Sequence, residues 1–289
     1  MYDIEGLHKK ELDILLAIHE VCEKMQIRYV LMFGTLIGAI RHKGFIPWDD
    51  DIDICMPRED YDIFIKEGEK YLPDNLKIQH FSLEYDCPNI FAKVRDNKTV
   101  FLASEHIGKD INQGVFIDVF PIECAGDNDG DILKEIRKRR LFTTINNCYD
   151  EAYVNTIKRK KSIFIAKMIR LFIINIYLHG VDKHHFIEKE DKRRYQKHLK
   201  NINKLAVVSY SDSKYAYDYN KLFERTEVEF EGYKFWGPKY YDEILTGLYG
   251  DYMQIPPVEK QIQHNPLYVD LNRGIQDLSE EELKEILKS

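Results

Sequence analysis

The feature that most constrains the fold is a pair of aspartates at the start of an apolar run. Asp51 and Asp53 are separated by one residue, and the run continues to residue 56. If residues 51–56 form a strand, alternation places both carboxylates on the same face. Two adjacent carboxylates repel each other, so they are costly to keep ionised unless a cation lies between them. The pattern predicts a divalent-cation site, because carboxylate and phosphate oxygens are the ligands that Mg²⁺ prefers.

A glycine turn before these aspartates supplies a second part of the predicted site. The apolar run 29–33 ends in Gly34 and Thr35, and a short helical segment, 36–42, follows. A strand that ends in Gly-Thr and opens a helix directs free backbone N–H groups and a hydroxyl toward whatever lies beyond it. An anion-binding turn facing a metal site suits phosphoryl or nucleotidyl transfer. The competing interpretation is an acidic surface loop after a short amphipathic helix, which we favour for Asp50 alone.

A third carboxylate lies in a strand-like segment much later in the chain. Residues 114–122 alternate, so Asp118 shares its expected face with Phe116 and Phe120. A charge among phenylalanines is costly without a partner, and a metal ion or a proton would resolve this. The alternative is a structural role, with the Asp118 carboxylate buried against Arg95 or a backbone amide.

These segments resemble the signature of the nucleotidyltransferase fold, a Gly-Ser or Gly-Thr turn followed by Asp-x-Asp. More narrowly, the chain resembles the LicD family, bacterial enzymes that move phosphocholine from CDP-choline onto a sugar. The same domain type occurs in fukutin-related protein, a ribitol-phosphate transferase. The matching residues are Gly34, Thr35, Gly38, Arg41, His42, Gly44, Pro47, Trp48, Asp49, Asp51 and Asp53. Later blocks around Arg95, Asp118 and residues 249–264 extend the resemblance over most of the chain outside residues 130–210.

The resemblance implies a set of catalytic and metal-binding residues. The expected catalytic residues are Asp51, Asp53 and Asp118, and the expected ligands of Mg²⁺ or Mn²⁺ are Asp49, Asp51, Asp53 and Asp118. We expect Asp118 to be the third metal ligand, the general base for the acceptor hydroxyl, or both. Asp49 would support the other ligands or hold a second metal ion.

The same comparison implies residues that contact the substrate. They are Gly34, Thr35, Arg41, His42, Trp48, Arg95, Lys260 and His264. Arg95 is expected either to contact substrate phosphate or to pair with a carboxylate as a structural prop. A helical turn would place Lys260 and His264 on one side, where they could hold phosphate or the leaving nucleotide, although a loop salt bridge is the alternative. Trp48 is a guess for the ring that receives a quaternary ammonium by cation–π attraction.

The expected fold is α+β, with a nucleotidyltransferase-like mixed sheet flanked by helices and a helical insertion. Helices are expected over residues 7–26, 57–71 and 127–150, a hairpin over 227–235, and a helix stopped by Gly250. Strands are expected over residues 28–33, 51–56, 76–81, 90–95, 99–103 and 114–122. We divide the chain into a catalytic core (1–126), a basic helical insertion (127–210) and a C-terminal hairpin with helices (211–289).

The charge of the chain is unevenly distributed. The net charge is −7, but residues 131–204 are strongly basic, which suggests an anionic partner such as a membrane surface or an acidic polymer. Within them, the apolar segment 162–179 contains Lys167 and Arg170 and is short for a spanning helix. We favour a buried helix over an interfacial one that would give peripheral membrane contact through residues 158–179.

The cysteines and the N-terminus bear on the cellular compartment. The five scattered cysteines form neither a disulfide framework nor a zinc pattern. The charged N-terminal segment lacks the apolar core of a signal peptide. We therefore expect a cytoplasmic protein, with peripheral attachment at the inner face of the cell membrane as an option.

The expected function is metal-dependent transfer of a phospho-alcohol to a hydroxyl of a cell-surface glycan precursor. The resemblance favours phosphocholine from CDP-choline as donor, a glycan or lipid-linked glycan as acceptor, CMP as product, and no nucleic-acid partner. One alternative is a nucleotidyltransferase that uses a nucleoside triphosphate and releases pyrophosphate. Another is a non-catalytic glycan-binding scaffold.

Overall fold

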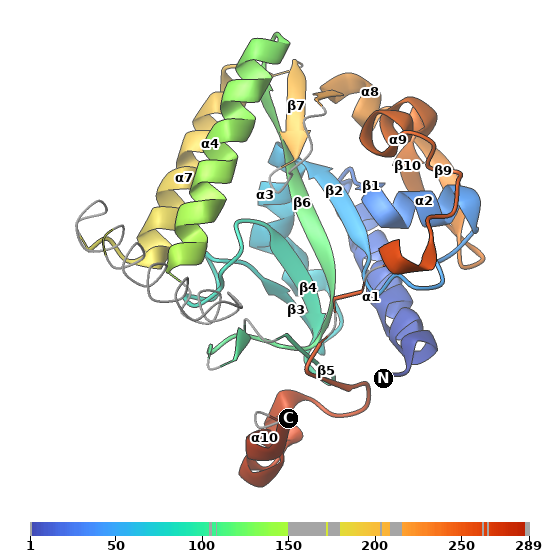
Figure 1. The fold of residues 1–289 in the computed structure, drawn as a ribbon, viewed down its shortest axis with the longest axis vertical. Coiled ribbons are helices and arrows are strands. Elements are labelled where there is room, and N and C mark those ends of the chain that lie inside the picture. The colour runs from blue at the N-terminus through green and yellow to red at the C-terminus, as the bar shows by residue number, and fades with distance from the viewer. Residues whose placement is uncertain are drawn as a thin grey trace.

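The computed structural model has an α+β fold built around one curled mixed β-sheet, as Figure 1 shows. It describes residues 2–103, 106–107, 109–149, 172, 180–202, 204–208, 216–261, 263–264 and 266–286. Most of the apolar core lies between the sheet and the helices that cover it. The expected fold class is confirmed.

The central sheet has seven strands within the described ranges, in the order β1-β2-β6-β4-β3, with β7 added to β6 and β8 to β7. These strands are β1 (Val30–Leu31), β2 (Asp53–Pro57), β3 (Leu76–Gln79), β4 (Ala92–Asp96), β6 (Val115–Gly126), β7 (Leu205–Val208) and β8 (Tyr217–Asp218). Strands β2 and β6 run parallel, and the other described pairs of this sheet are antiparallel. The long strand β6, buried along its whole length, is therefore the centre of the sheet.

Helices surround this sheet, and two small strand pairs lie outside it (Figure 1). The helices are α1 (Ile4–Met25), α2 (Phe33–Arg41), α3 (Arg58–Glu67), α4 (Asp129–Cys148), α7 (Lys183–Leu199), α8 (Tyr219–Phe223), α9 (Tyr241–Tyr249) and α10 (Glu280–Ile286). Within the described residues, 3₁₀ turns occupy Gly68–Tyr71, Val258–Lys260 and Ile275–Asp277. The outer strand pairs are β9 (Arg225–Phe230) with β10 (Tyr233–Pro238), and β5 (Val100–Leu102) with β11 (Tyr268–Asp270).

The first helix shows how the sequence pattern produces these elements. Buried residues recur along α1 at three- and four-residue spacing, as in Leu7, Ile14, Ile18 and Val21. The Asp3 carboxylate caps the helix by accepting a hydrogen bond from the Gly6 N–H. The helix expected over residues 7–26 is confirmed, with its start three residues earlier.

Two expected strands differ from the structure. The strand expected over 28–33 is reduced to β1, because α2 already begins at Phe33 and takes the following residues into its first turn. The strand expected over 99–103 exists as β5, but it pairs with β11 from the C-terminal part of the chain and not with the central sheet. The hairpin expected over 227–235 and the helix stopped by Gly250 are confirmed as β9-β10 and α9.

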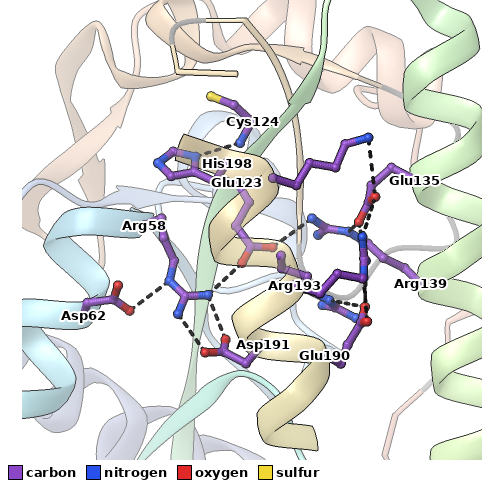
Figure 2. Close-up of polar contacts among 12 residues, drawn as sticks. Arg58, Asp62, Glu123, Cys124, Glu135, Arg139, Glu190, Asp191, Arg193 and His198 are labelled. Carbon is purple, nitrogen blue, oxygen red and sulfur yellow. Dashed lines mark hydrogen bonds and ion pairs between the residues drawn. The ribbon is translucent and has the colours of Figure 1, made fainter. Parts of the chain in front are cut away.

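Buried ion pairs attach α7 and α4 to the sheet, as Figure 2 shows. The Glu123 carboxylate on β6 accepts hydrogen bonds from Arg58 on α3 (2.7 Å) and from Arg139 on α4 (2.8 Å). Arg58 also binds Asp191 on α7, and Arg193 on α7 binds Glu135 on α4. These ion pairs join α3, β6, α4 and α7. Each buried charge has a partner of opposite sign, which is the condition for burying it.

The basic run 189–204, most of which lies on α7, faces solvent only in part. Arg194 and His198 of α7 are buried against the rest of the protein, while Lys192 and Lys200 of the same run face solvent. The apolar segment 162–179 lies outside the described residues apart from residue 172. None of the described helices has the length and apolar character that crossing a membrane requires.

Candidate active site

Three carboxylates from two strands converge at one end of the parallel pair β2-β6. Asp53, the first residue of β2, lies opposite Asp118 in the register of β6, and Asp51 lies two residues earlier in the chain. One carboxylate oxygen from each lies within 4.8 Å of the others. Alternation on parallel strands places the side chains of facing residues on the same side of the sheet. The two segments that the sequence singled out separately are therefore brought together.

The electrostatics of this cluster favour a bound cation. Burial, together with the neighbouring Asp51 and Asp118, raises the pKa of Asp53 well above its ordinary value. Burial also raises the pKa of Asp51 to about 6. Both shifts measure the cost of holding like charges together away from water. A set of three carboxylate oxygens fits Mg²⁺ or Mn²⁺, whose binding would remove that cost.

The start of α2 packs directly against this cluster. The Thr35 hydroxyl accepts a hydrogen bond from the Asp53 N–H at 2.8 Å, which ties the helix to the start of β2. Gly34 lies under the Asp49 carboxylate, where an added Cβ would come within 2.5 Å of Asp49 Oδ2. Phe33 has a φ of 50°, in the left-handed region that is strained for a residue other than glycine. The Gly-Thr turn thus shapes the rim of the carboxylate cluster.

Asp49 lies beside the three converging carboxylates but is not one of them. Its side chain packs over Gly34, and it is absent from the group whose oxygens meet. Burial, with repulsion from Asp51 and Asp50, raises its pKa to about 7. Its expected role as a metal ligand stays a prediction.

The partner of Asp118 is Lys93, which the sequence analysis did not single out. Lys93 lies across from Asp118 in the register of β4 and β6, and its ammonium is 2.5 Å from Asp118 Oδ1. The ammonium also lies 3.5 Å from the centre of the Phe116 ring. Desolvation lowers the pKa of Lys93, although Asp118 opposes that shift. Little in the sequence marked Lys93, because β4 also contains Arg95 and Asp96, and the partner of Lys93 depends on the strand register.

Arg95 follows Lys93 by two residues on β4, and its guanidinium lies over the same Phe116 ring. Its guanidinium is fully buried and donates to Gln79 Oε1 at 2.7 Å and to the Gly114 carbonyl at 2.6 Å. It therefore supports the junction of β3, β4 and β6. These buried hydrogen bonds agree with the structural role expected for Arg95, although its partners are an amide oxygen and a carbonyl in place of a carboxylate. Its expected contact with substrate phosphate stays a prediction.

His264 returns from the C-terminal part of the chain to the aspartate segment. Its Nδ1 lies 2.9 Å from Asp50 Oδ1, and its Nε2 lies 3.8 Å from Asp51 Oδ2. The hydrogen bond to Asp50 raises the pKa of His264 to about 9, which makes it a cation at neutral pH. Asp50 also accepts a hydrogen bond from the Tyr2 hydroxyl at 2.6 Å. The buried Asp50 is therefore an anchor for both ends of the chain and not part of a solvated loop.

Lys260 lies in a different place from His264. The 3₁₀ turn Val258–Lys260 ends at Lys260, so the helical turn expected to join the two side chains is absent from the described residues. Lys260 instead lines a pocket of about 560 Å³ together with Arg41 and Trp48. Three of the predicted substrate-binding residues thus share one cavity. His42 lies outside that cavity and accepts a hydrogen bond from Arg41 Nε at 2.9 Å.

A sixth acidic side chain, near these five aspartates, also escaped the sequence analysis. Glu11 of α1 is 2% exposed, and its Oε2 has no hydrogen-bond partner among the described residues. Burial and the charges of Asp49, Asp50, Asp51 and Asp53 raise its pKa well above the ordinary value. The available signal was its spacing, because Glu11 lies four residues after Leu7 and three before Ile14 on the buried face of α1.

Comparison with known proteins gives one match along the whole chain and two short ones. The family model for "LicD/FKTN/FKRP, nucleotidyltransferase domain" matches residues 26–124. The chain is 32% identical over 270 residues to the lipopolysaccharide cholinephosphotransferase LicD of Haemophilus influenzae, covering 88% of this chain and 92% of that protein. An uncharacterized protein of Rickettsia typhi is 38% identical over 69 residues, 24% of this chain and 22% of its own length. An uncharacterized protein of Rickettsia prowazekii is 52% identical over 42 residues, 14% of this chain and 16% of its own length.

Proposed function

The chain belongs to the LicD family, and on this premise we propose that it transfers phosphocholine from CDP-choline to a hydroxyl of a cell-surface glycan and releases CMP. The relative from Haemophilus influenzae is named a lipopolysaccharide cholinephosphotransferase, which supports a lipopolysaccharide-type acceptor. The observation that carries the proposal is the convergence of Asp51, Asp53 and Asp118 on one point.

The three carboxylates are the residues that would hold Mg²⁺ or Mn²⁺. A bound divalent cation supplies charge neutralisation for the donor diphosphate and for the leaving phosphate. The carboxylate oxygens present are the donors that such ions prefer. The raised pKa values of Asp51 and Asp53 support the proposal, because like charges held together away from water favour a bound cation. Asp49, over Gly34, is available to support this set.

The bond changes follow from the proposed donor and products. The acceptor oxygen forms a bond to the phosphorus that carries choline, and the bond from that phosphorus to the bridging oxygen breaks. The electron pair of that bond leaves with CMP, and the proton of the acceptor hydroxyl passes to a carboxylate. We assign this proton to Asp118, whose other oxygen contacts Lys93 and is thereby held in a fixed orientation.

Two further features orient the phosphates. The N-terminal end of α2 at Gly34 and Thr35 lies beside Asp53 and carries the positive end of the helix dipole. His264, a cation 3.8 Å from Asp51, lies at the open side of the cluster with its side chain about half exposed. Both place positive charge where an anionic diphosphate would approach the carboxylates.

The test is a product assay with purified protein, CDP-choline, MgCl₂ and a choline-free lipopolysaccharide acceptor. We expect CMP release coupled to acceptor labelling, and a loss of more than about a hundredfold in Asp51→Asn, Asp53→Asn and Asp118→Asn. Asp74→Asn, a change of an exposed aspartate far from the cluster in sequence, is the matched control and should keep full activity. Retained activity in a cluster variant removes that residue from the mechanism.

The same assay separates the proposed reaction from nucleotidyl transfer. A nucleotidyltransferase would attack the phosphorus nearest the nucleoside of CTP or ATP and release pyrophosphate. We expect no pyrophosphate from either nucleotide in the presence of acceptor. Pyrophosphate release coupled to acceptor labelling would overturn the proposal.

A further inference from the structure

A pocket of about 560 Å³ lies beside the carboxylate cluster and belongs to three separate parts of the chain. Ile37 and Arg41 come from α2, and Ile46 and Trp48 from the loop that leads to Asp49. The remaining walls come from the segment 249–260 at and after the end of α9. Arg41 fixes this segment, because its guanidinium donates to the carbonyls of Tyr252 (2.7 Å) and Gln254 (3.3 Å).

The lining of the pocket combines flat apolar surfaces with three charged side chains, those of Arg41, Lys260 and Asp251. Trp48, Tyr249 and Tyr252 supply aromatic rings, and the Pro256-Pro257 pair supplies a rigid apolar edge. Lys260 is a cation at this pocket, and its ammonium has no ion pair among the described residues. Such a surface suits a flat ring that stacks on an aromatic side chain and carries a negatively charged group.

The pocket and the carboxylate cluster are built in part from neighbouring stretches of the same two segments, α2 and residues 46–53. Trp48 immediately precedes Asp49, whose carboxylate covers Gly34 at the start of α2. Gly34 and Arg41 lie on the same helix, seven residues or about 10 Å apart along its axis at 1.5 Å per residue. Tyr249 lines the pocket, and the pKa of its phenol is raised by burial and by the charges of Asp53, Asp49 and Asp51. A ligand that fills the pocket can therefore extend its phosphates toward the three carboxylates.

We propose that this pocket binds the nucleotide half of the donor, with the pyrimidine ring against Trp48 and a phosphate oxygen at Lys260. This inference rests on the proposed function and assigns one end of the donor to one part of the site. The opposite assignment, with the choline group in the pocket, would place a quaternary ammonium beside the charges of Arg41 and Lys260. Like charges in a partly desolvated site disfavour that arrangement. The choline end then lies on the other side of the carboxylates, toward the acceptor.

Tryptophan fluorescence provides a direct test, because the chain has two tryptophans. In the Trp236→Phe protein, Trp48 is the remaining emitter. We expect CMP to quench its emission saturably, and phosphocholine to have no effect at the same concentrations. Lys260→Gln should weaken CMP binding about tenfold, as for loss of a charge-assisted hydrogen bond. Lys66→Gln, at an exposed lysine of α3, is the matched control.

The results distinguish failure of the nucleotide subsite from failure of the proposed choline transfer. Saturable quenching by phosphocholine, or unchanged CMP affinity in Lys260→Gln, would overturn the assignment of the pocket. If choline transfer proceeds but Lys260→Gln and Trp48→Leu leave the KM for CDP-choline unchanged, the subsite fails and the proposed function stands. If CMP binds as expected but no choline is transferred, the proposed function fails and the nucleotide subsite stands.

Discussion

The ammonium of Lys93 lies 2.5 Å from the Asp118 carboxylate, directly across the antiparallel pair β4-β6. Lys93 and the cationic His264, 3.8 Å from Asp51, thus face a cluster of three acidic side chains. The cluster retains an excess of negative charge, which is the electrostatic basis for binding a divalent ion and an anionic donor.

Replacement of Lys93 by methionine should destabilise the metal-free protein more than the metal-bound protein. The change leaves Asp118 buried without its partner, and breaking a buried pair costs about 3–5 kcal/mol. Saturating Mg²⁺ should reduce the loss, because the ion neutralises the same carboxylates. Thermal unfolding with EDTA and with MgCl₂ measures both states, with Lys77→Met on β3 as the matched control. An equal loss in the two conditions would show that Lys93 is not coupled to the metal-binding carboxylates.

The ion pairs that attach α4 and α7 to the sheet should govern stability in acid. Burial raises the pKa of Glu135, but hydrogen bonds from Arg193 and the charge of Arg139 outweigh it and lower the pKa to about 2. The pKa of this carboxyl is lower in the folded protein than in the unfolded chain, where it is near 4.5. Its ionised form therefore stabilises the fold above pH 4.5, and this contribution is lost as the pH falls through 2. The contribution at neutral pH is on the order of 3 kcal/mol.

Denaturant unfolding from pH 6 to pH 2 measures this effect. The Glu135→Gln protein should be less stable at pH 6 and should lose less stability between pH 4.5 and pH 2 than the unchanged protein. Glu280→Gln, at an exposed glutamate of α10, serves as the control. Parallel pH profiles for Glu135→Gln and the unchanged protein would contradict the assigned role of this carboxylate.

Glu11, in contrast to Glu135, should lower the stability of the metal-free protein at neutral pH. Its pKa is raised in the folded protein, so folding requires an unfavourable proton uptake at any pH above the unfolded value near 4.5. Glu11→Gln removes that cost and should raise the free energy of unfolding, with a gain that grows by up to about 1.4 kcal/mol per pH unit. Unfolding measured in EDTA at pH 5 and pH 8 tests this expectation. A gain that is the same at both values would mean that the Glu11 carboxylate is already ionised in the folded state.

The sequence was sufficient for the parts of the site that local patterns encode. Strand alternation was enough to place Asp51 with Asp53 and to mark Asp118. The sequence signal of a helix start was enough to mark the Gly34-Thr35 turn. The resemblance to LicD proteins also linked these segments. The three carboxylates lie together because β2 pairs in parallel with β6. The separate motifs could not give the register of that pairing.

The partners of residues that meet across long stretches of chain could not be found in this way. Lys93 meets Asp118 only because of the β4-β6 register, and Arg95 turns to Gln79 and Gly114 because β3 lies beside β4. His264 and Asp50 are more than two hundred residues apart in the chain. The helical turn expected to join Lys260 to His264 failed because the 3₁₀ turn ends at Lys260. Spacing along the chain says nothing about such long-range pairs.

The central claim is that Asp51, Asp53 and Asp118 together hold one divalent cation. Isothermal titration of the metal-free protein with Mn²⁺ tests it most directly, with Asp118→Asn and the Asp74→Asn control titrated alongside. We expect one saturable site in the unchanged and control proteins, and at least a tenfold weaker site in Asp118→Asn. Absence of Mn²⁺ binding in the unchanged protein, or equal affinity in Asp118→Asn, would contradict the account.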